Sequence, residues 1–301
     1  MDLSKRFYQA ANSTLMMLIT DCKPFLMTTF SSLQLSALML RRRRAFSPLL
    51  SVLLGVIFWG MTGLDATQVS AEPPETAPPE LTNLIEGIED AANRQDVDGV
   101  MQYYGQDFST TDGLDRRSFR TVLTQLWQNY SQIRYQTTLQ SWEQEGSAIL
   151  ATTVTEITGR QEFNGREFLL TATITSQQRI ENQQVVEQNV LAEQNQLTSG
   201  EEPPTVTLVV PEQVKAGQQY TVDAIVEEPL GDEILIGTAI EERVTPRAYL
   251  TEFPLELEFL TAGGVFKVGT APQTPGNNWI SAILMRQGGI TLVTKRLKIF
   301  D

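Results

Sequence analysis

Apolar residues recur at three- and four-residue steps where the regularly patterned part of the chain begins. Leu81, Leu84, Ile85, Ile88 and Ala92 follow this spacing. Because an α-helix turns once in about 3.6 residues, the spacing puts these side chains on one face. The pattern therefore predicts an amphipathic helix that packs this face against a core.

Two more helices are predicted downstream, and each is introduced by an aspartate that can cap its first turn. Asp96 precedes a short second helix, and Asp115 precedes a longer third helix. The apolar stripe of the second helix consists of Val97, Val100, Met101 and Tyr104. That of the third consists of Phe119, Val122, Leu123, Leu126, Trp127 and Tyr130.

After Tyr130 the apolar period changes to two, which is typical of β-strands with one buried face. Asn164-Gly165 and Glu181-Asn182 are turn signals between such segments. Helices on one face of an antiparallel meander make an α+β layer architecture. The predicted strands cover residues 133–143, 147–159, 162–177 and 183–194.

From residue 205 onward, short strand-like segments alternate with turn signals rich in glycine, proline and asparagine. This spacing predicts an all-β sandwich. Pro-rich segments at 72–79 and 199–204 are expected to be linkers, so we predict domains at 80–198 and 205–301. The predicted strands are 205–211, 219–226, 233–240, 255–259, 264–268, 279–285 and 291–300.

The first 71 residues have the order of features found in an export signal. Four arginines, Arg41 to Arg44, precede an uncharged stretch at 45–64, and Val69-Ser70-Ala71 offers the small residues that signal peptidase requires. We predict cleavage after Ala71, with residues 45–64 as an uncleaved anchor in the alternative. Either reading exports the rest, to the periplasm or a thylakoid lumen. Arg43-Arg44-Ala45-Phe46 also resembles a twin-arginine signal, so both export routes stay open.

Composition narrows the chemistry that the exported part can perform. The sequence has no histidine, and its single cysteine, Cys22, precedes the predicted cleavage site. We therefore expect no cofactor and no metal site, since the usual transition-metal ligands are missing. Asp96-x-Asp98-Gly99 and Asp112-x-x-Asp115 lack the spacing of a calcium loop.

Charge points away from nucleic acids and anionic membranes as partners. Removal of residues 1–71 takes away seven basic and three acidic residues, which changes the formal charge from −13 to −17. Phosphate partners need clustered lysine and arginine, so we expect contact with a membrane only through the leader.

The segment from Asn93 to Phe108, followed by a capped helix and a strand meander, resembles the nuclear transport factor 2-like superfamily, which includes the SnoaL-like proteins. The resemblance covers about residues 80–197. It implies a cone of three helices on a curved antiparallel sheet, with Tyr103, Tyr104 and Asp107 at the end of the second-helix pattern. It also implies pairing of cone domains through their sheets, so we expect a homodimer.

The second half resembles the immunoglobulin-like modules of bacterial exported proteins. The likeness lies in Pro211-x-x-Val214-x-x-Gly217-x-x-Tyr220-x-Val222, where one strand turns into the next. Domains of this type usually bind or space other parts of a protein.

These features predict a non-enzymatic binding or scaffold protein that presents a cone pocket or a sheet face to a small apolar ligand or a protein. Trp127, Tyr130 and Trp142 are expected to line the pocket with the two tyrosines and Asp107, although core packing would also explain such aromatic residues. One alternative is an isomerase, dehydratase or cyclase with an Asp or Glu base. Another is an assembly adaptor of an envelope or thylakoid complex, whose cone would be filled by side chains. For the enzyme alternative, the candidate bases on the predicted strands are Glu156, Glu162, Glu167 and Glu187.

Overall fold

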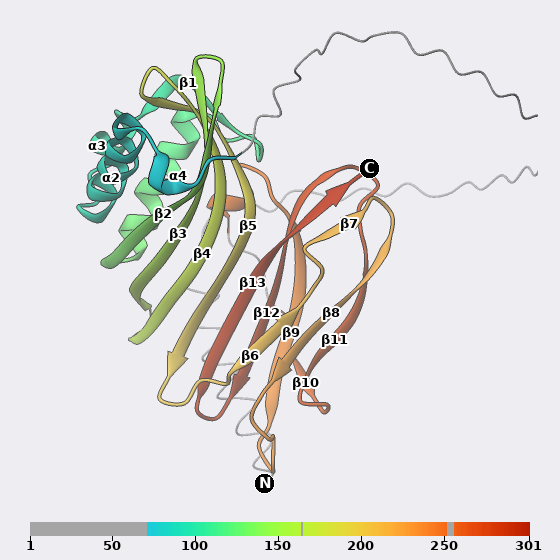
Figure 1. The fold of residues 1–301 in the computed structure, drawn as a ribbon. Coiled ribbons are helices and arrows are strands. Elements are labelled where there is room, and N and C mark those ends of the chain that lie inside the picture. Colours follow the sequence, from blue (N-terminus) through green and yellow to red (C-terminus); the bar gives the residue numbers. More distant parts are fainter. Residues whose placement is uncertain (1–70, 164, 252–255) are drawn as a thin grey trace, which may run out of the picture. The chain divides into compact units, whose positions relative to one another are not determined.

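The computed structural model describes residues 71–163, 165–251 and 256–301 (Figure 1). The predicted signal peptide and the alternative anchor at 45–64 lie outside the described residues. In the part that is described, no helix has the length and hydropathy needed to cross a membrane.

The three predicted helices are present. They are α2 (Pro79–Asn93), α3 (Val97–Met101) and α4 (Arg116–Asn129), preceded by a 3₁₀ turn, η1 (Pro74–Thr76). Both predicted caps form: Asp96 accepts a hydrogen bond from Gly99 N at 2.9 Å, and Asp115 accepts one from Ser118 N at 2.7 Å. Ser118 Oγ in turn accepts from Asp115 N, which completes a capping box.

The second helix is shorter than predicted, because Tyr104 begins a strand instead of ending the helix. Strand β1 (Tyr104–Thr110) pairs in parallel with the beginning of strand β5 (Gln184–Gly200). Tyr104 and Phe108 are both buried in the core, so Tyr104 is a core residue of a strand and not part of the predicted helical stripe. Residues 104–110 form a strand because they pair with the edge of β5, and the local sequence gives no sign of this distant partner.

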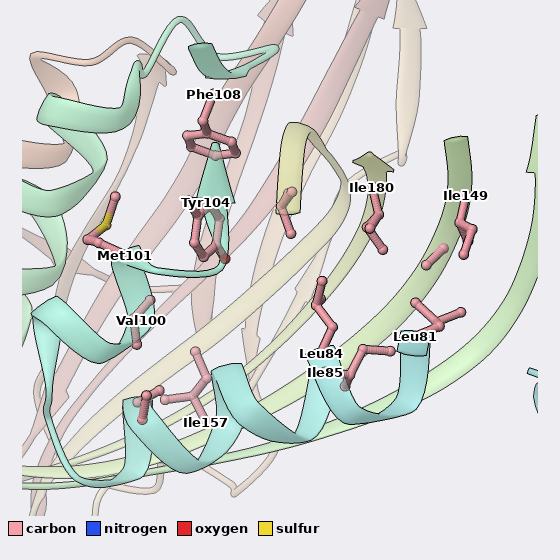
Figure 2. Packing of buried hydrophobic residues seen from close by; sticks show 14 of the residues in the cluster. Leu81, Leu84, Ile85, Val100, Met101, Tyr104, Phe108, Ile149, Ile157 and Ile180 are labelled. Carbon is pink, nitrogen blue, oxygen red and sulfur yellow. The ribbon is translucent and has the colours of Figure 1, made fainter. Parts of the chain in front are cut away.

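The four-stranded meander is confirmed: β2 (Gln132–Glu145), β3 (Ala148–Phe163), β4 (Arg166–Glu181) and β5 (Gln184–Gly200). Asn182 and Gln183 both have positive φ angles, of 51° and 60°, as a two-residue hairpin turn requires. The helices cover one face of this curved sheet, and a core of aliphatic and aromatic side chains fills the space between them (Figures 1 and 2). Few helices on a mostly antiparallel sheet are consistent with the predicted cone.

The second half consists of strands that surround a core of their own, and their pairing is antiparallel except for the parallel pair of β7 and β13. One sheet has the order β11-β8-β6, and the other runs β10-β9-β12-β13. A 3₁₀ turn, η2 (Ala248–Leu250), lies between β9 and β10. The strands are β6 (Val206–Val209), β7 (Gln213–Lys215), β8 (Gln219–Val226), β9 (Leu235–Arg243), β10 (Glu258–Leu260), β11 (Gly264–Thr270), β12 (Gly276–Arg286) and β13 (Gly289–Phe300).

One sheet runs through both halves, because β13 pairs with β5. Ser199 and Gly200, which were predicted to begin a linker, are paired with Ile290 and Gly289. The two halves therefore have separate cores but share backbone hydrogen bonds, and the proposed division into domains at 199–204 stays a prediction.

Candidate functional site

A cavity of about 740 Å³ lies against the inner face of this shared sheet. Its walls come from α2, α4 and strands β2 to β5, and also from η2, β9, β12 and β13. Small-molecule sites usually have volumes of about 300–1,000 Å³, so the cavity has the size expected for a ligand pocket. Both halves of the chain are needed to form it.

The floor of the cavity includes one row of side chains that crosses seven neighbouring strands. Pairing registers place Trp279 between Glu242 and Arg296, and they place Ile174 between Glu193 and Thr155. An ion pair between Arg296 and Glu193 joins the two parts of the row. In order across the sheet, the row is Glu242, Trp279, Arg296, Glu193, Ile174, Thr155 and Thr137. All except Arg296 line the cavity.

Two irregularities in β5 determine which of its side chains belong to the cavity. The pairing of β5 with β4 skips Val186 and again skips Leu191. A β-bulge of one residue moves the following side chains to the other face. Glu187 is therefore exposed, whereas Glu193 lines the cavity.

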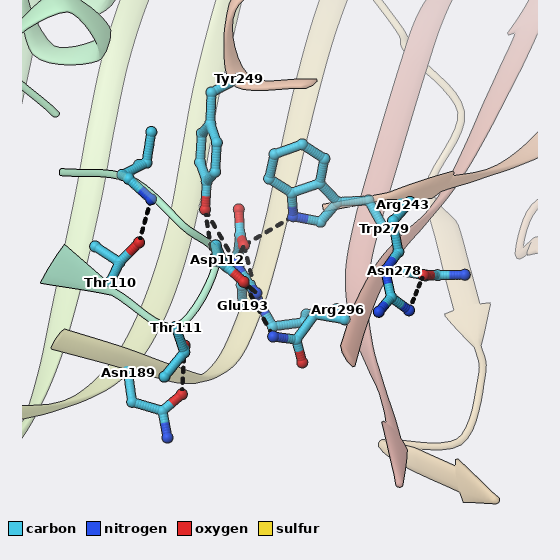
Figure 3. Close-up of polar contacts among 12 residues, drawn as sticks. Thr110, Thr111, Asp112, Asn189, Glu193, Arg243, Tyr249, Asn278, Trp279 and Arg296 are labelled. Atoms are coloured by element: carbon cyan, nitrogen blue, oxygen red, sulfur yellow. Dashed lines mark hydrogen bonds and ion pairs between the residues drawn. The ribbon is translucent and has the colours of Figure 1, made fainter. Parts of the chain in front are cut away.

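Arg296 is the centre of a buried charge network at one end of the cavity (Figure 3). Its side chain is 1% exposed, and that of Asp112 is 2% exposed. Nη1 donates to both carboxylate oxygens of Asp112 at 3.0 Å, and Nη2 donates to Oε2 of Glu193 at 2.8 Å. Asp112 precedes α4, Glu193 lies on β5 and Arg296 lies on β13, so the network joins the two halves of the chain.

Neutral side chains from the second half complete the hydrogen bonds of the two acids. Tyr249 Oη donates to Asp112 at 2.9 Å, Asn277 Nδ2 donates to Asp112 at 3.0 Å, and Trp279 Nε1 donates to Glu193 at 2.9 Å. Burial raises the pKa of the Tyr249 phenol well above its usual value. Burial is the largest influence on Arg296 and acts to lower its pKa, but the interactions with Glu193, Tyr249 and Asp112 together outweigh burial and raise the pKa, so the guanidinium stays charged.

The opposite end of the cavity is mainly apolar, with a small number of satisfied polar groups. Trp127 Nε1 donates to the Tyr135 hydroxyl at 2.8 Å. Burial raises the pKa of Tyr135 to about 12, although this hydrogen bond partly offsets the increase. The apolar walls include Ile88, Val100, Leu123, Leu126, Ile157, Leu170, Ala172 and Ile174.

All the charged side chains that line the cavity are acidic. They are Glu89, Asp112, Glu193 and Glu242, and neither lysine nor arginine is among the described lining residues. Glu89 accepts a hydrogen bond from Thr137 N at 2.6 Å, and burial raises the pKa of Glu242. Among the described residues, no group of three or more acids is arranged to hold a metal ion.

Three of the six side chains predicted from the sequence line the cavity: Tyr104, Trp127 and Tyr130. Tyr104 is buried against the rings of Phe108 and Phe119, and burial raises its pKa. The structure brings these three residues together, but their role in ligand binding stays a prediction.

The other three, Tyr103, Asp107 and Trp142, do not line it. Tyr103 packs against Gly87 of α2, and a Cβ atom at position 87 would collide with the Tyr103 hydroxyl. Asp107 is exposed on β1. Trp142 Nε1 donates to Thr76 Oγ1 at 3.2 Å, and the Trp142 backbone pairs with Glu72. Trp142 therefore holds the proline-rich segment at 72–79 against the sheet.

The acids proposed from the sequence as catalytic bases are misplaced for that role. Glu156, Glu162, Glu167 and Glu187 are all exposed. The acids that do line the cavity were missed, because Asp112 lies in a loop and Glu193 follows a bulge. Tyr249, Trp279 and Arg296 were missed because no local pattern connects them with the first half.

Comparison with known proteins gives weak similarities over part of the chain. Among solved structures, a Bdellovibrio bacteriovorus protein has a TM-score of 0.28 and 16% identity over 37% of this chain, and the match spans 40% of that protein. An epoxide hydrolase of Mycobacterium tuberculosis has a TM-score of 0.27 and 12% identity over 37% of this chain and 80% of its own. An NTF2-like protein of unknown function from Cytophaga hutchinsonii has a TM-score of 0.23 and 12% identity over 38% of this chain and 91% of its own. We draw no functional conclusion from scores this low.

Matches based on sequence concern only the second half. No curated protein matches the chain. The model of one family, a domain of unknown function (DUF8623), matches residues 201–300, which is about a third of the sequence.

Proposed function

We propose that this chain is an exported, non-enzymatic binding protein that holds a small, largely apolar molecule in the cavity. The observation that carries the proposal is the cavity itself, which has a volume of about 740 Å³, walls rich in apolar side chains and a buried cluster of charged groups around Arg296. An adaptor whose cone is filled by side chains would not need such a space. Export rests on the sequence of residues 41–71.

The proposed architecture is a nuclear transport factor 2-like cone followed by an immunoglobulin-like sandwich. Strand order supports the second assignment: β6, β8 and β11 correspond to strands A, B and E of such a sandwich, and β9, β12 and β13 correspond to C, F and G. We further propose that the protein forms a homodimer. Light scattering at micromolar concentration tests this, and the mass of a strict monomer would refute it.

A substitution on the cavity floor tests the binding function. Ala172 lines the cavity on β4, and Thr173 is exposed on the other face of the same strand. Phenylalanine at 172 would occupy the space that a ligand needs, while phenylalanine at 173 would point away from it. We expect Nile red, a neutral apolar dye, to bind the parent chain and the Thr173→Phe variant but not Ala172→Phe. Equal binding by all three proteins, each folded by circular dichroism, would refute a ligand site here.

An enzyme is the second candidate, and one observation favours it. Glu242 lines the cavity, and burial raises its pKa, as a general base requires. Asp112 is less suitable because Arg296, Tyr249 and Asn277 already donate to its oxygens. Conversion of a defined metabolite by the parent chain but not by Glu242→Gln would establish the enzyme and overturn the binding proposal.

A further inference from the structure

We infer that the ligand is an organic cation, an alkylammonium ion whose charged group lies beside Glu242 and Trp279 and whose apolar tail extends along the cavity. This inference deepens the proposed function and rests on it. It follows from three properties of the polar end of the cavity: an acid without a partner, an uncompensated negative charge, and a pair of aromatic rings.

Glu242 supplies the acid without a partner. It lies on β9 directly opposite Trp279 of β12, and it lines the cavity and is partly buried. Among the described residues, no hydrogen bond or ion pair to its carboxylate is observed. A partly buried carboxylate of this kind is costly unless a cation or a donor approaches it. The cavity is the side from which a ligand can do so.

The network around Arg296 does not neutralise this end of the cavity. Arg296 compensates one negative charge, whereas Asp112 and Glu193 carry two. All the donors to Glu193 bond to its Oε2: Arg296 Nε, Arg296 Nη2 and Trp279 Nε1. With Glu242 and Glu89, the lining is strongly acidic, and Coulomb repulsion acts against an anionic ligand.

The aromatic pair fits the same kind of ligand. The rings of Tyr249 and Trp279 are in edge-to-face contact, with centroids 4.8 Å apart and an angle of 82° between their planes. Both residues line the cavity, and Trp279 stands in the row between Glu242 and Arg296. The faces of Trp and Tyr rings attract ammonium groups, and carboxylates nearby add to this attraction.

The size and apolar walls of the cavity favour an organic cation over a metal ion. A bare metal ion would occupy a small part of about 740 Å³ and would leave the walls of leucine, isoleucine and tryptophan without a partner. An alkyl chain of moderate length would cover those walls and remove them from water.

Three probes with the same tail test the charge of the ligand. Decyltrimethylammonium, decanol and decanoate each have an unbranched chain of ten carbons, which in decanoate includes the carboxylate carbon, and they differ in the charge of the head group. Each is titrated below its micelle-forming concentration into the purified full-length chain by calorimetry. We expect the ammonium probe to bind at least about tenfold more tightly than decanol, with decanoate the weakest. We expect Glu242→Gln to weaken the ammonium probe about fivefold and to leave decanol unchanged.

Glu187→Gln is the matched control, because it removes the same charge from an exposed position on β5. It should bind all three probes as the parent chain does. If decanol binds as tightly as the ammonium probe, or if Glu242→Gln, shown by circular dichroism to be folded, binds the ammonium probe as the parent does, the cation inference is wrong and the binding function stands. If none of the three probes binds, both proposals are wrong.

Discussion

Replacement of Arg296 by methionine should destabilise the protein more than most single substitutions. The side chain is 1% exposed and gives all of its observed hydrogen bonds to Asp112, Glu193 and Tyr249. Methionine has a similar length but carries no charge. The variant would leave two carboxylates in the same buried region without a cation between them.

The expected loss can be bounded from measured ion pairs. Removal of one partner from a buried pair costs about 3–5 kcal/mol, because the remaining charge is left uncompensated. Glu193 is 13% exposed on its side chain, so water relieves part of its charge and a value near the lower bound is expected. Against a total stability of about 5–15 kcal/mol, this is a large fraction. The melting temperature should fall by about 10 °C.

The assay is urea unfolding followed by tryptophan fluorescence, with two further variants as controls. Arg296→Lys keeps the charge but loses the guanidinium geometry, so it should lie between the parent and Arg296→Met. The triple variant Asp112→Asn, Glu193→Gln, Arg296→Met removes all three charges and should recover part of the loss. A loss below about 1 kcal/mol for Arg296→Met would refute the reasoning, since that is the value of an exposed pair. A triple variant less stable than Arg296→Met would refute it equally.

Three other substitutions test single interactions by the same unfolding assay. Tyr135→Phe removes the acceptor of the Trp127 indole and should cost about 1 kcal/mol. Burial raises the pKa of Tyr135 in the folded state from 10.0 to about 12. The stability that the neutral phenol contributes below pH 10 is therefore lost as the pH rises from 10 to 12. The free energy of unfolding of Tyr135→Phe should fall less steeply than that of the parent over this pH range. Glu242→Gln should be more stable than the parent at pH 7, since burial raises the pKa of this acid and ionised Glu242 therefore destabilises the folded state. The difference in stability should disappear below pH 4.5, the ordinary pKa of a glutamate. A variant less stable than the parent at pH 7 would contradict this. Gln188→Leu removes an amide oxygen that is buried without a hydrogen bond in the described structure, but it also removes the 3.4 Å hydrogen bond from Gln188 Nε2 to Ser176 Oγ. Stability should therefore change by less than about 1 kcal/mol, and a larger loss would point to a bound water or ligand at that oxygen.

The elements of this fold could be predicted wherever the signal is local. Asp96 and Asp115 predict the starts of the helices that they cap. The change in apolar spacing from a helical period to a period of two after Tyr130 predicts the start of the meander. Tyr104 was assigned to the wrong element because the residue that it pairs with, Val185 of β5, lies about eighty residues later in the sequence. Local propensity is a weak guide at such a position, since pairing with a distant edge overrides it.

The site was less predictable than the fold because its polar residues meet only through the pairing of distant strands. Asp112 and Arg296 are 184 residues apart in the sequence, and Glu193 and Trp279 are 86 apart. Nothing in the segments around them signals these contacts. Only the pairing of β13 with β5, which carries the sheet across the predicted linker, puts them on one surface.

Register within β5 decides the chemistry of the cavity even after the strand itself is known. Strict alternation from the buried Val185 would turn both Glu187 and Glu193 inward. The bulge at Val186 turns Glu187 outward, and the bulge at Leu191 restores the phase so that Glu193 faces Arg296. With the first bulge alone, Ala192 and Gln194 would face inward, and Arg296 would lose one of its two acidic partners. The acidic end of the cavity therefore depends on two β-bulges in β5, at Val186 and Leu191. The alternation of apolar and polar residues in the sequence does not predict either bulge.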